Sequence, residues 1–305
     1  MINYINSYSQ LQLENMSDSN VVSVHLMGGL GNQLFQLFAC ISYGLSHARR
    51  IILPYSDILT TGTIRNTYWD TLFHTIKHMT TFVNTQYTID SLAQFATFRE
   101  NGYRFKPIGP SHVPNVRLYG YFQSPNYFQE HYDTICSLMN LPNQIYLTRN
   151  AYPQYFTENT ITVSMHFRIG DYINIQDHHP IMPVQYYLSA LQHILMLHNG
   201  NPCEVLYFCE QSDIDTVSYM ISQIKGVVHN VNFVRADNAI SDWEQLLLMS
   251  NCQDNIIANS TFSWWGAYLN QTRNKHVCYP MNWFGPSAKH DVINLFPEDW
   301  QRIMW

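Results

Sequence analysis

Charge is scarce in this chain. Only 12% of its 305 residues are charged, against about 25% in an average globular domain. The 16 Lys and Arg residues are outnumbered by 22 Asp and Glu, which gives a net charge of −6. Proteins that bind nucleic acid usually carry a basic stripe, and none is evident here, so we expect no nucleic-acid partner. Hydrophobic residues still make up 46% of the chain, which predicts a folded protein with sizeable cores.

Long apolar runs and paired cysteines are also missing. No segment approaches the ~18 consecutive apolar residues of a membrane-spanning helix, and the polar residues 1–20 lack the pattern of a signal peptide. We therefore expect a disordered leader over residues 1–20 and a soluble, cytoplasmic protein without a transmembrane anchor. The six cysteines form no CxxC pair, which predicts buried free thiols and no disulfide framework.

Alternating strand and helix patterns predict an α/β protein with two domains. A valine-rich strand at 21–27 is followed by a glycine break and then by a helix with apolar residues at helical spacing. This strand–loop–helix–strand order implies parallel strands. From residue 160 the alternation becomes regular, as in a doubly wound sheet. We expect a Rossmann-like N-terminal domain over residues 21–155 and a second one over residues 156–305.

The first of three notable motifs is Gly-Gly-Leu-Gly-Asn-Gln at 28–33, directly after the first predicted strand. Glycines let a backbone approach a ligand closely, and the N-terminus of the following helix favours an anion. A tight packing turn explains the pattern equally well. The dinucleotide fingerprint would need Gly or Ala where Leu34 stands and an acidic residue about 20 positions further on. Both are missing, which disfavours an NAD-dependent oxidoreductase.

The second and third motifs also follow predicted strands, where ligands bind in open α/β sheets. In His166–Tyr172, Arg168 presents a planar fork of donors that suits a diphosphate, although a surface pair with Asp171 is an alternative. In the third motif, Asn259–Tyr268, the first three side chains are typical N-cap residues beside the free N–H groups of a helix. We interpret the two tryptophans of this motif as core residues and not as a sugar platform.

Two segments resemble metal sites. Asp213-Ile214-Asp215 has the DxD pattern with which some transferases hold a metal diphosphate, and Asp177-His178-His179 offers three ligand types. Asp213-Ile214-Asp215 opens a predicted helix, where the helix dipole stabilises negatively charged side chains. We prefer this interpretation to a metal site. The second precedes Pro180 in a predicted loop without a separate third ligand, so we expect it to be solvated.

Taken together, the three motifs resemble glycosyltransferase family 11, the α-1,2-fucosyltransferases. With two further similar segments, Leu118–Ser124 and Tyr279–Phe284, the matches run in order from residue 28 to residue 284. The resemblance implies a GT-B fold, with two facing Rossmann-like domains and a central cleft. It implies an inverting transfer of L-fucose from GDP-fucose without a metal or another cofactor. It also implies an oligosaccharide acceptor, a terminal β-galactoside modified at its 2-hydroxyl, and the aromatic-rich region 60–150 is expected to help bind it.

The resemblance also assigns the site residues. Arg168 falls on the first arginine of the family motif, which holds the β-phosphate, and the N-terminal loop is expected to face the donor across the cleft. Asp171 and Glu210 are both candidates for the general base. An alternative role for Asp171 is to orient Arg168 without taking a proton. Arg168, Asp171 and Glu210 thus form the expected catalytic set. The expected donor-binding residues are Gly31, Asn32, Gln33, His166, Arg168, Asn259, Ser260, Thr261 and Phe262.

The sequence departs from the family pattern at two places. The second arginine of the family motif is Ile169 here, and a segment that usually reads Phe-Ser-Asp-Asp is Phe208-Cys209-Glu210-Gln211. These departures keep two alternatives open. One is a transferase with another GDP-sugar or another fucosyl linkage, and the other is a catalytically inactive GDP-sugar binder.

Overall fold

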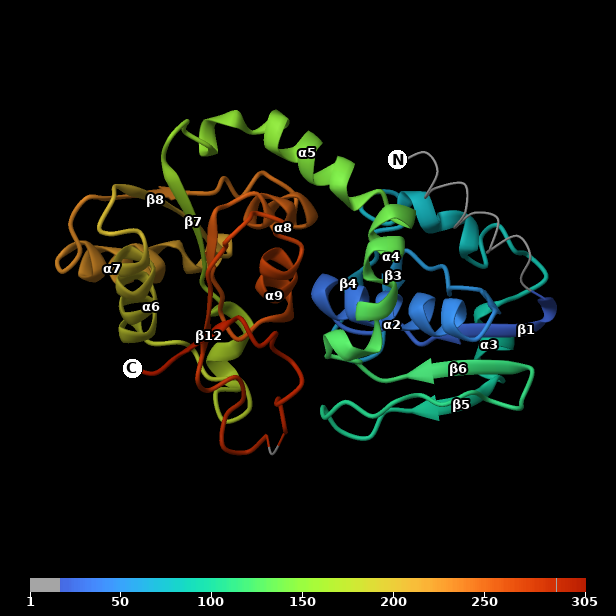
Figure 1. Cartoon of the computed structure of the whole chain (residues 1–305). Coiled ribbons are helices and arrows are strands. Elements are labelled where there is room, and N and C mark those ends of the chain that lie inside the picture. The colour runs from blue at the N-terminus through green and yellow to red at the C-terminus, as the bar shows by residue number, and fades with distance from the viewer. Residues whose placement is uncertain (1–16, 289) are drawn as a thin grey trace. The chain divides into compact units, whose positions relative to one another are not determined.

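The computed structural model describes residues 17–288 and 290–305, which form two compact units (Figure 1). The first unit contains the described chain up to Gln144 together with His290–Pro297, and the second contains the remainder from Ile145 on. The boundary thus lies before the predicted position at 155/156, and a C-terminal segment joins the first unit. Residues 1–16 of the predicted leader lie outside the described residues. Its last residues, 17–20, instead form the start of strand β1 (Ser17–Val24).

The first unit is built on a four-stranded parallel sheet with the order β2-β1-β6-β5. Besides β1 it contains β2 (Arg49–Ile51), β5 (Ala96–Arg99) and β6 (Asn115–Tyr119). Helix α2 (Leu30–Ser46) connects β1 to β2, as the sequence predicts, and nearly all of its residues are buried. A Cβ on Gly44 would lie 2.5 Å from Ile51 Cγ1, so this glycine lets α2 pack closely on β2.

Short elements complete the first unit, in the region that the sequence leaves irregular. Strands β3 and β4 pair antiparallel as a separate two-stranded sheet. The last helix, α5, continues into the second unit. These elements are β3 (Ile58–Leu59), β4 (Arg65–Asn66), η1 (His74–Met79), α3 (Ile89–Ala93), η2 (Pro125–Tyr127), η3 (Gln129–His131), α4 (Tyr132–Leu138) and α5 (Leu141–Ala151).

The second unit contains a six-stranded sheet with the order β12-β11-β10-β7-β8-β9, in which every pair is parallel. Counted in chain order from the β9 edge, the strands read 3-2-1-4-5-6, which is the order of the Rossmann dinucleotide-binding sheet. The strands are β7 (Ile161–His166), β8 (Cys203–Phe208), β9 (Val231–Arg235), β10 (Asp254–Ile256), β11 (Val277–Pro280) and β12 (Gln301–Ile303). The sequence pattern did not predict β12.

Helices cover both faces of this sheet (Figure 1). Val205 of β8 belongs to an apolar cluster with residues of α6 and α7, whereas the next residue, Leu206, packs with Met249 of α8 on the other face. Both side chains are buried, so the strand is a continuous apolar run, as parallel sheets require. The elements outside the sheet are η4 (Pro153–Tyr155), η5 (Gly170–Asn174), α6 (Val184–Leu197), η6 (Gln211–Asp213), α7 (Ile214–Lys225), α8 (Asp242–Ser250) and α9 (Thr261–Tyr268).

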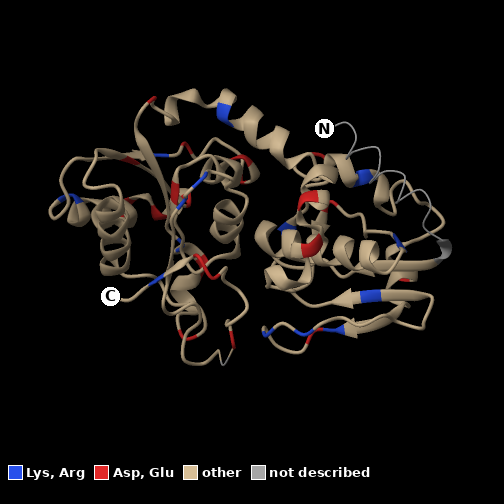
Figure 2. Ribbon diagram, viewed as in Figure 1, with Lys and Arg blue, Asp and Glu red and all other residues tan. Residues whose placement is uncertain are grey.

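Several expectations can be compared directly with these units. The α/β class is confirmed, as two units that each have a parallel sheet, the pair of building blocks expected of a GT-B protein. The six cysteines are buried and free, as predicted. Trp264 and Trp265 are wholly buried, which confirms them as core residues. Within residues 17–288 and 290–305, none of the helices has the length and apolarity needed to cross a bilayer. In the same residues, Lys and Arg are spread over both units (Figure 2).

One helix start differs from its prediction. Ser241-Asp242-Trp243-Glu244 has the sequence of a capping box, and α8 does begin there. In the structure, however, the Ser241 hydroxyl donates to Glu244 Oε2 at 2.5 Å and accepts no backbone N–H of the first turn. The sequence pattern predicts a capping box at this helix start, and that prediction is wrong, because the serine hydroxyl and the Glu244 carboxylate bond to each other and not to the backbone.

Candidate active site

The sheet of the second unit has its topological switch point between β7 and β10. From β7 the chain adds β8 and β9 on one side, and it then returns to place β10 on the other side of β7. The connections that follow β7 and β10 therefore leave toward opposite faces, and ligands of doubly wound folds bind at the carboxyl ends of such a strand pair. β7 and β10 pair with Met165 opposite Ile256. The motifs at His166–Tyr172 and Asn259–Tyr268 follow these two strands.

Arg168, just beyond the end of β7, contacts both carboxylates that the sequence indicates as catalytic. Its Nη2 donates to Asp171 Oδ1 at 2.7 Å, and its Nη1 donates to Glu210 Oε1. Glu210 follows β8, so the pair joins the carboxyl ends of two neighbouring strands. A guanidinium has five N–H donors, of which these bonds use two. Arg168 is 20% exposed, and the two carboxylates are about half exposed, so the group is fixed from one side and open to a ligand.

Asp213 accepts a hydrogen bond from the backbone of the turn after β7. The backbone N–H of Gly170 donates to Asp213 Oδ2 at 2.9 Å, and a Cβ on Gly170 would lie 2.8 Å from Glu210 Oε2. Because Gly170 has no side chain, Glu210 can lie against the turn. Asp213 is buried, whereas Asp215 of the same DxD pattern is exposed. Asp213 therefore has a structural partner in the turn after β7.

Tyr172 connects the two motifs. The Arg168 guanidinium carbon lies 5.2 Å from the centre of the Tyr172 ring, and the Tyr172 hydroxyl donates to the Asn259 carbonyl at 3.1 Å. The Asn259 side chain donates to the carbonyls of Pro180, at 2.9 Å, and Trp283, at 3.2 Å. The motifs that follow β7 and β10 thus meet in one place, although they are far apart in the sequence.

The N-cap of α9 is Ser260 alone. Its hydroxyl accepts the N–H of Phe262 at 3.3 Å, and Thr261 is the first residue of the helix. Asn259 is buried, and its Oδ1 has no hydrogen-bond partner among the described residues. A buried polar atom without a partner costs about 1–3 kcal/mol. This oxygen is therefore available to a donor group of a ligand or to a water molecule.

His166, the last residue of β7, is buried and lies with its ring 5.5 Å from that of Phe262. Burial, and next the positive charge of Arg168, lower the pKa of His166 to about 3. The imidazole is therefore neutral near pH 7. Its Nδ1 is buried and has no hydrogen-bond partner in the described part of the chain, so His166 can act as a neutral hydrogen-bonding group and not as a cation.

Ile169 occupies the position of the second arginine of the family motif. It is buried among the apolar residues of the second unit, in contact with the core on the α6 side of the sheet. The backbone therefore directs this side chain into the core. Ile169 therefore supplies no charge beside Arg168.

In the first unit, the expected donor-binding residues Gly31, Asn32 and Gln33 lie in the first turn of α2 and not in a loop. Gln33 is wholly buried, and its Nε2 donates to the carbonyls of Gly28, at 3.1 Å, and Asn66, at 2.8 Å. Asn32 Oδ1 accepts a hydrogen bond from Gln123 at 2.9 Å. These side chains hold the turn together, and their contact with a donor stays a prediction.

Gly28, just before this helix, has a backbone conformation that favours glycine. Its φ is +80°, and a Cβ would lie 2.5 Å from Asn32 Nδ2. A side chain here would be both strained and in collision with the first turn of α2. The packing-turn interpretation therefore accounts for this glycine without a ligand.

The doubly wound sheet and the meeting of the two motifs at its switch point define a protein that binds a ligand at the carboxyl ends of β7 and β10. The chain is a member of glycosyl transferase family 11, whose family model matches residues 2–303.

Two curated relatives come from Escherichia coli. The O-antigen biosynthesis glycosyltransferase WbnK is 31% identical over 184 residues, which cover 56% of this chain and 56% of that protein. This match therefore spans little more than half of either protein. An alpha-1,2-colitosyltransferase is 26% identical over 302 residues, or 93% of this chain and 99% of that protein.

Among solved structures, the chain is similar to a mutant of Arabidopsis thaliana FUT1 in complex with GDP. It is 12% identical, has a TM-score of 0.48 and is matched over 96% of this chain and 78% of that chain. POFUT1 in complex with GDP-fucose is 11% identical with a TM-score of 0.48, over 86% of this chain and 98% of that chain. NodZ alpha-1,6-fucosyltransferase soaked with GDP-fucose is 12% identical with a TM-score of 0.43, over 82% and 92%.

Proposed function

We propose that this protein transfers L-fucose from GDP-fucose to a hydroxyl of an oligosaccharide, the 2-hydroxyl of a terminal β-galactoside, with inversion and without a metal ion. The observation that carries the proposal is the position of Arg168 at the switch point between β7 and β10, fixed by Asp171 and Glu210. Membership of glycosyl transferase family 11 supports the reaction class. The donor sugar and the acceptor are our inference from that family.

The reaction makes one bond and breaks another. The acceptor oxygen attacks the anomeric carbon of fucose, the bond from that carbon to the β-phosphate oxygen breaks, and GDP leaves with the electron pair. Negative charge then grows on the β-phosphate, where preorganised donors stabilise it most effectively. Arg168 and the first-turn N–H groups of α9, which lack partners within the helix, are the donors that we assign to this charge.

The proton of the acceptor hydroxyl needs a base, for which Asp171 and Glu210 remain the candidates. Both carboxylates bond to Arg168 in this structure, so each has an orienting role whether or not it also takes the proton. Replacing each by its amide separates the two roles. Loss of the base lowers kcat by about 100–10,000-fold, and loss of an orienting contact alone acts more weakly.

Arg168→Ala tests the assignment of the phosphate ligand. Removing one preorganised donor costs about 100–1000-fold in kcat, and Arg168→Lys should recover only part of it, because an ammonium keeps the charge but lacks the fork. The rate is measured as acceptor-dependent release of GDP. Arg273→Ala, at an exposed arginine of the same unit, is the matched control. Normal turnover by Arg168→Ala would refute the assignment.

The activity itself is tested with GDP-fucose and with lactose or N-acetyllactosamine as acceptors, in the presence of EDTA. We expect release of GDP only when an acceptor is present, and no effect of the chelator. Activity that disappears with EDTA and returns with a divalent ion would contradict the metal-independent mechanism. Binding of GDP without turnover on any acceptor would support the alternative of a catalytically inactive binder.

A second candidate is transfer of colitose, the sugar that differs from fucose by lacking the 3-hydroxyl. The relative named as an alpha-1,2-colitosyltransferase, which matches 93% of this chain, favours it. A site that hydrogen-bonds a substrate hydroxyl rejects the analogue without it by about 10⁴–10⁵-fold. The ratio of kcat/KM for GDP-fucose and GDP-colitose therefore decides between the donors, and a strong preference for GDP-colitose would replace our first proposal.

A further inference from the structure

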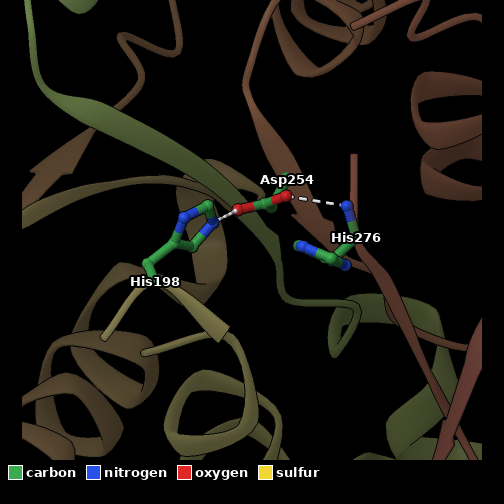
Figure 3. A group of neighbouring side chains, drawn as sticks. All are labelled: His198, Asp254 and His276. Atoms are coloured by element: carbon green, nitrogen blue, oxygen red, sulfur yellow. Dashed lines mark hydrogen bonds and ion pairs between the residues drawn. The ribbon is translucent and has the colours of Figure 1, made fainter. Parts of the chain in front are cut away.

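Three potential metal ligands converge at the amino end of the sheet in the second unit (Figure 3). His198 follows α6, Asp254 is the first residue of β10, and His276 directly precedes β11. One ligand atom from each residue lies within 4.8 Å of the others. Parallel strands start at the same edge of a sheet, so this cluster lies at the opposite edge from Arg168. The proposed transfer reaction does not use it.

The centre of the cluster is a buried carboxylate. Asp254 is 0% exposed, its Oδ2 accepts a hydrogen bond from His198 Nε2 at 2.6 Å, and its Oδ1 accepts the backbone N–H of His276 at 2.7 Å. An ionised carboxylate away from water requires a compensating positive charge. The ion pair that the structure gives Asp254 is with His198, which supplies a charge only when it is protonated. A bound cation would supply that charge without protonating the histidine.

The ligand types indicate which cation fits. Two imidazoles and one carboxylate are a donor set that Zn²⁺ takes in tetrahedral sites, with water as the fourth ligand. The two rings lie on either side of the carboxylate (Figure 3), with their centres 5.7 Å apart. The backbone N–H of His276 orients the Asp254 carboxylate from outside, as second-shell donors do in metal sites. His198 and His276 are partly exposed, which gives an ion a path to the buried carboxylate.

We propose that His198, Asp254 and His276 bind a divalent transition-metal ion, with Zn²⁺ as the preferred one, and that this ion ties the end of α6 to the starts of β10 and β11. Ligands at about 2.1 Å from a tetrahedral ion lie about 3.4 Å from one another, so binding draws the side chains together. The metal takes the place of the proton between His198 Nε2 and Asp254. The site lies away from Arg168 and is independent of turnover.

Zinc binding to the untagged, full-length protein tests the proposal. After treatment with a chelator, the protein is titrated with ZnCl₂, and bound metal is measured by equilibrium dialysis. We expect one equivalent per chain and a higher Tm with zinc. His276→Ala should weaken zinc affinity by more than the roughly 10–100-fold that loss of a second-shell partner costs. It should also abolish the rise in Tm. The bond between His198 and Asp254 and the backbone N–H of residue 276 remain in this variant, so the fold is kept.

The controls separate this site from other ligands in the chain. His229→Ala, at an exposed histidine of the same unit, should bind zinc like the unchanged protein. Cobalt in place of zinc should give the visible bands of a tetrahedral site without thiolate charge transfer. Thiolate charge transfer would assign the ion to cysteine and overturn the proposal. Equal zinc affinity in the unchanged protein and His276→Ala would also overturn it and leave a purely structural hydrogen bond. In both the unchanged protein and His276→Ala, we expect GDP release to be insensitive to EDTA.

Discussion

At the scale of single residues, Arg168 and its two carboxylates form the best-defined part of the candidate site. The sequence pattern alone indicated Arg168 and Asp171, whereas Glu210 came only from the resemblance to a family. The structure adds that both carboxylates contact the same guanidinium, one from the turn after β7 and one from the end of β8. Glu210 lies far from Arg168 in the sequence. No local pattern predicts this contact, because it depends on β7 and β8 being neighbours.

The ionisation of His166 leads to a residue-scale prediction. Its pKa is lowered to about 3, chiefly by burial, whereas in the unfolded chain it is about 6.5. Between these values the unfolded state binds the proton and the folded state does not, so the free energy of unfolding falls as the pH drops from about 6.5 to 3. In His166→Gln this contribution is absent. Urea unfolding at a series of pH values should therefore give a shallower acid dependence for the variant than for the unchanged protein.

The same group bears on the pH dependence of activity. Because His166 is neutral above pH 5, it should contribute no limb to the pH–rate profile between pH 5 and 8. The profiles of the unchanged protein and His166→Gln should thus have the same shape, whatever their absolute rates. A limb near pH 6.5 that disappears in the variant would show that His166 titrates in the folded protein.

At the scale of structural elements, the turn from β7 into η5 determines how Arg168 is presented. Gly170→Ala would place a methyl group 2.8 Å from Glu210 Oε2, and because Glu210 is half exposed its side chain can move into solvent. We expect little change in stability, about 0.5 kcal/mol or less. Loss of the Glu210 contact leaves Arg168 less precisely positioned, which should lower kcat/KM by up to about 100-fold.

A double-mutant cycle checks the cause. If Glu210 only orients Arg168, Glu210→Ala should reproduce the effect of Gly170→Ala on GDP release. The double variant should then lose little more than either single variant, because both changes remove the contact between Glu210 and Arg168. Additive losses would mean that the glycine acts on something other than Glu210.

The helix and strand types themselves follow from local patterns. Apolar residues recur at helical spacing over Val184–Leu197 and predict a helix there, and α6 has those bounds. The helix start at Ser241 shows the limit of such patterns. Ser241 and Glu244 have the right spacing for a capping box, but a direct bond between the two side chains competes with the backbone. Spacing alone cannot decide whether the serine hydroxyl accepts a backbone N–H or donates to the carboxylate.

At the scale of the whole molecule, the buried cysteines predict sensitivity to alkali. Burial raises the pKa of the thiols of Cys203 and Cys209 to about 11 and of Cys136 and Cys278 to about 12, and it also raises those of Cys40 and Cys252. Unfolded thiols ionise near pH 8.5. Between about pH 9 and 11 the folded state therefore holds protons that the unfolded state has lost, and the free energy of unfolding falls as the pH rises.

Urea unfolding in reducing buffer at pH 8, 9 and 10 measures this effect. Each thiol that stays protonated only in the folded state contributes about 1.4 kcal/mol per pH unit above its unfolded pKa. In Cys252→Ala the free energy of unfolding should fall less steeply with pH, by the contribution of one thiol. A free energy of unfolding that is constant over this range would contradict the burial of the cysteines.

The sequence by itself determined the α/β class, the order of the motifs and the burial of the free cysteines. It could do so because the local pattern of apolar residues indicates which strands and helices are buried. Only the tertiary structure decided which of these elements are neighbours. The sheet order of the second unit places β7 beside β10, so Arg168 meets the start of α9 through Tyr172. It also brings Asp254 and His276 together with His198 at the opposite edge. Side chains so far apart in the chain become partners only through non-local strand pairing, which no local pattern encodes.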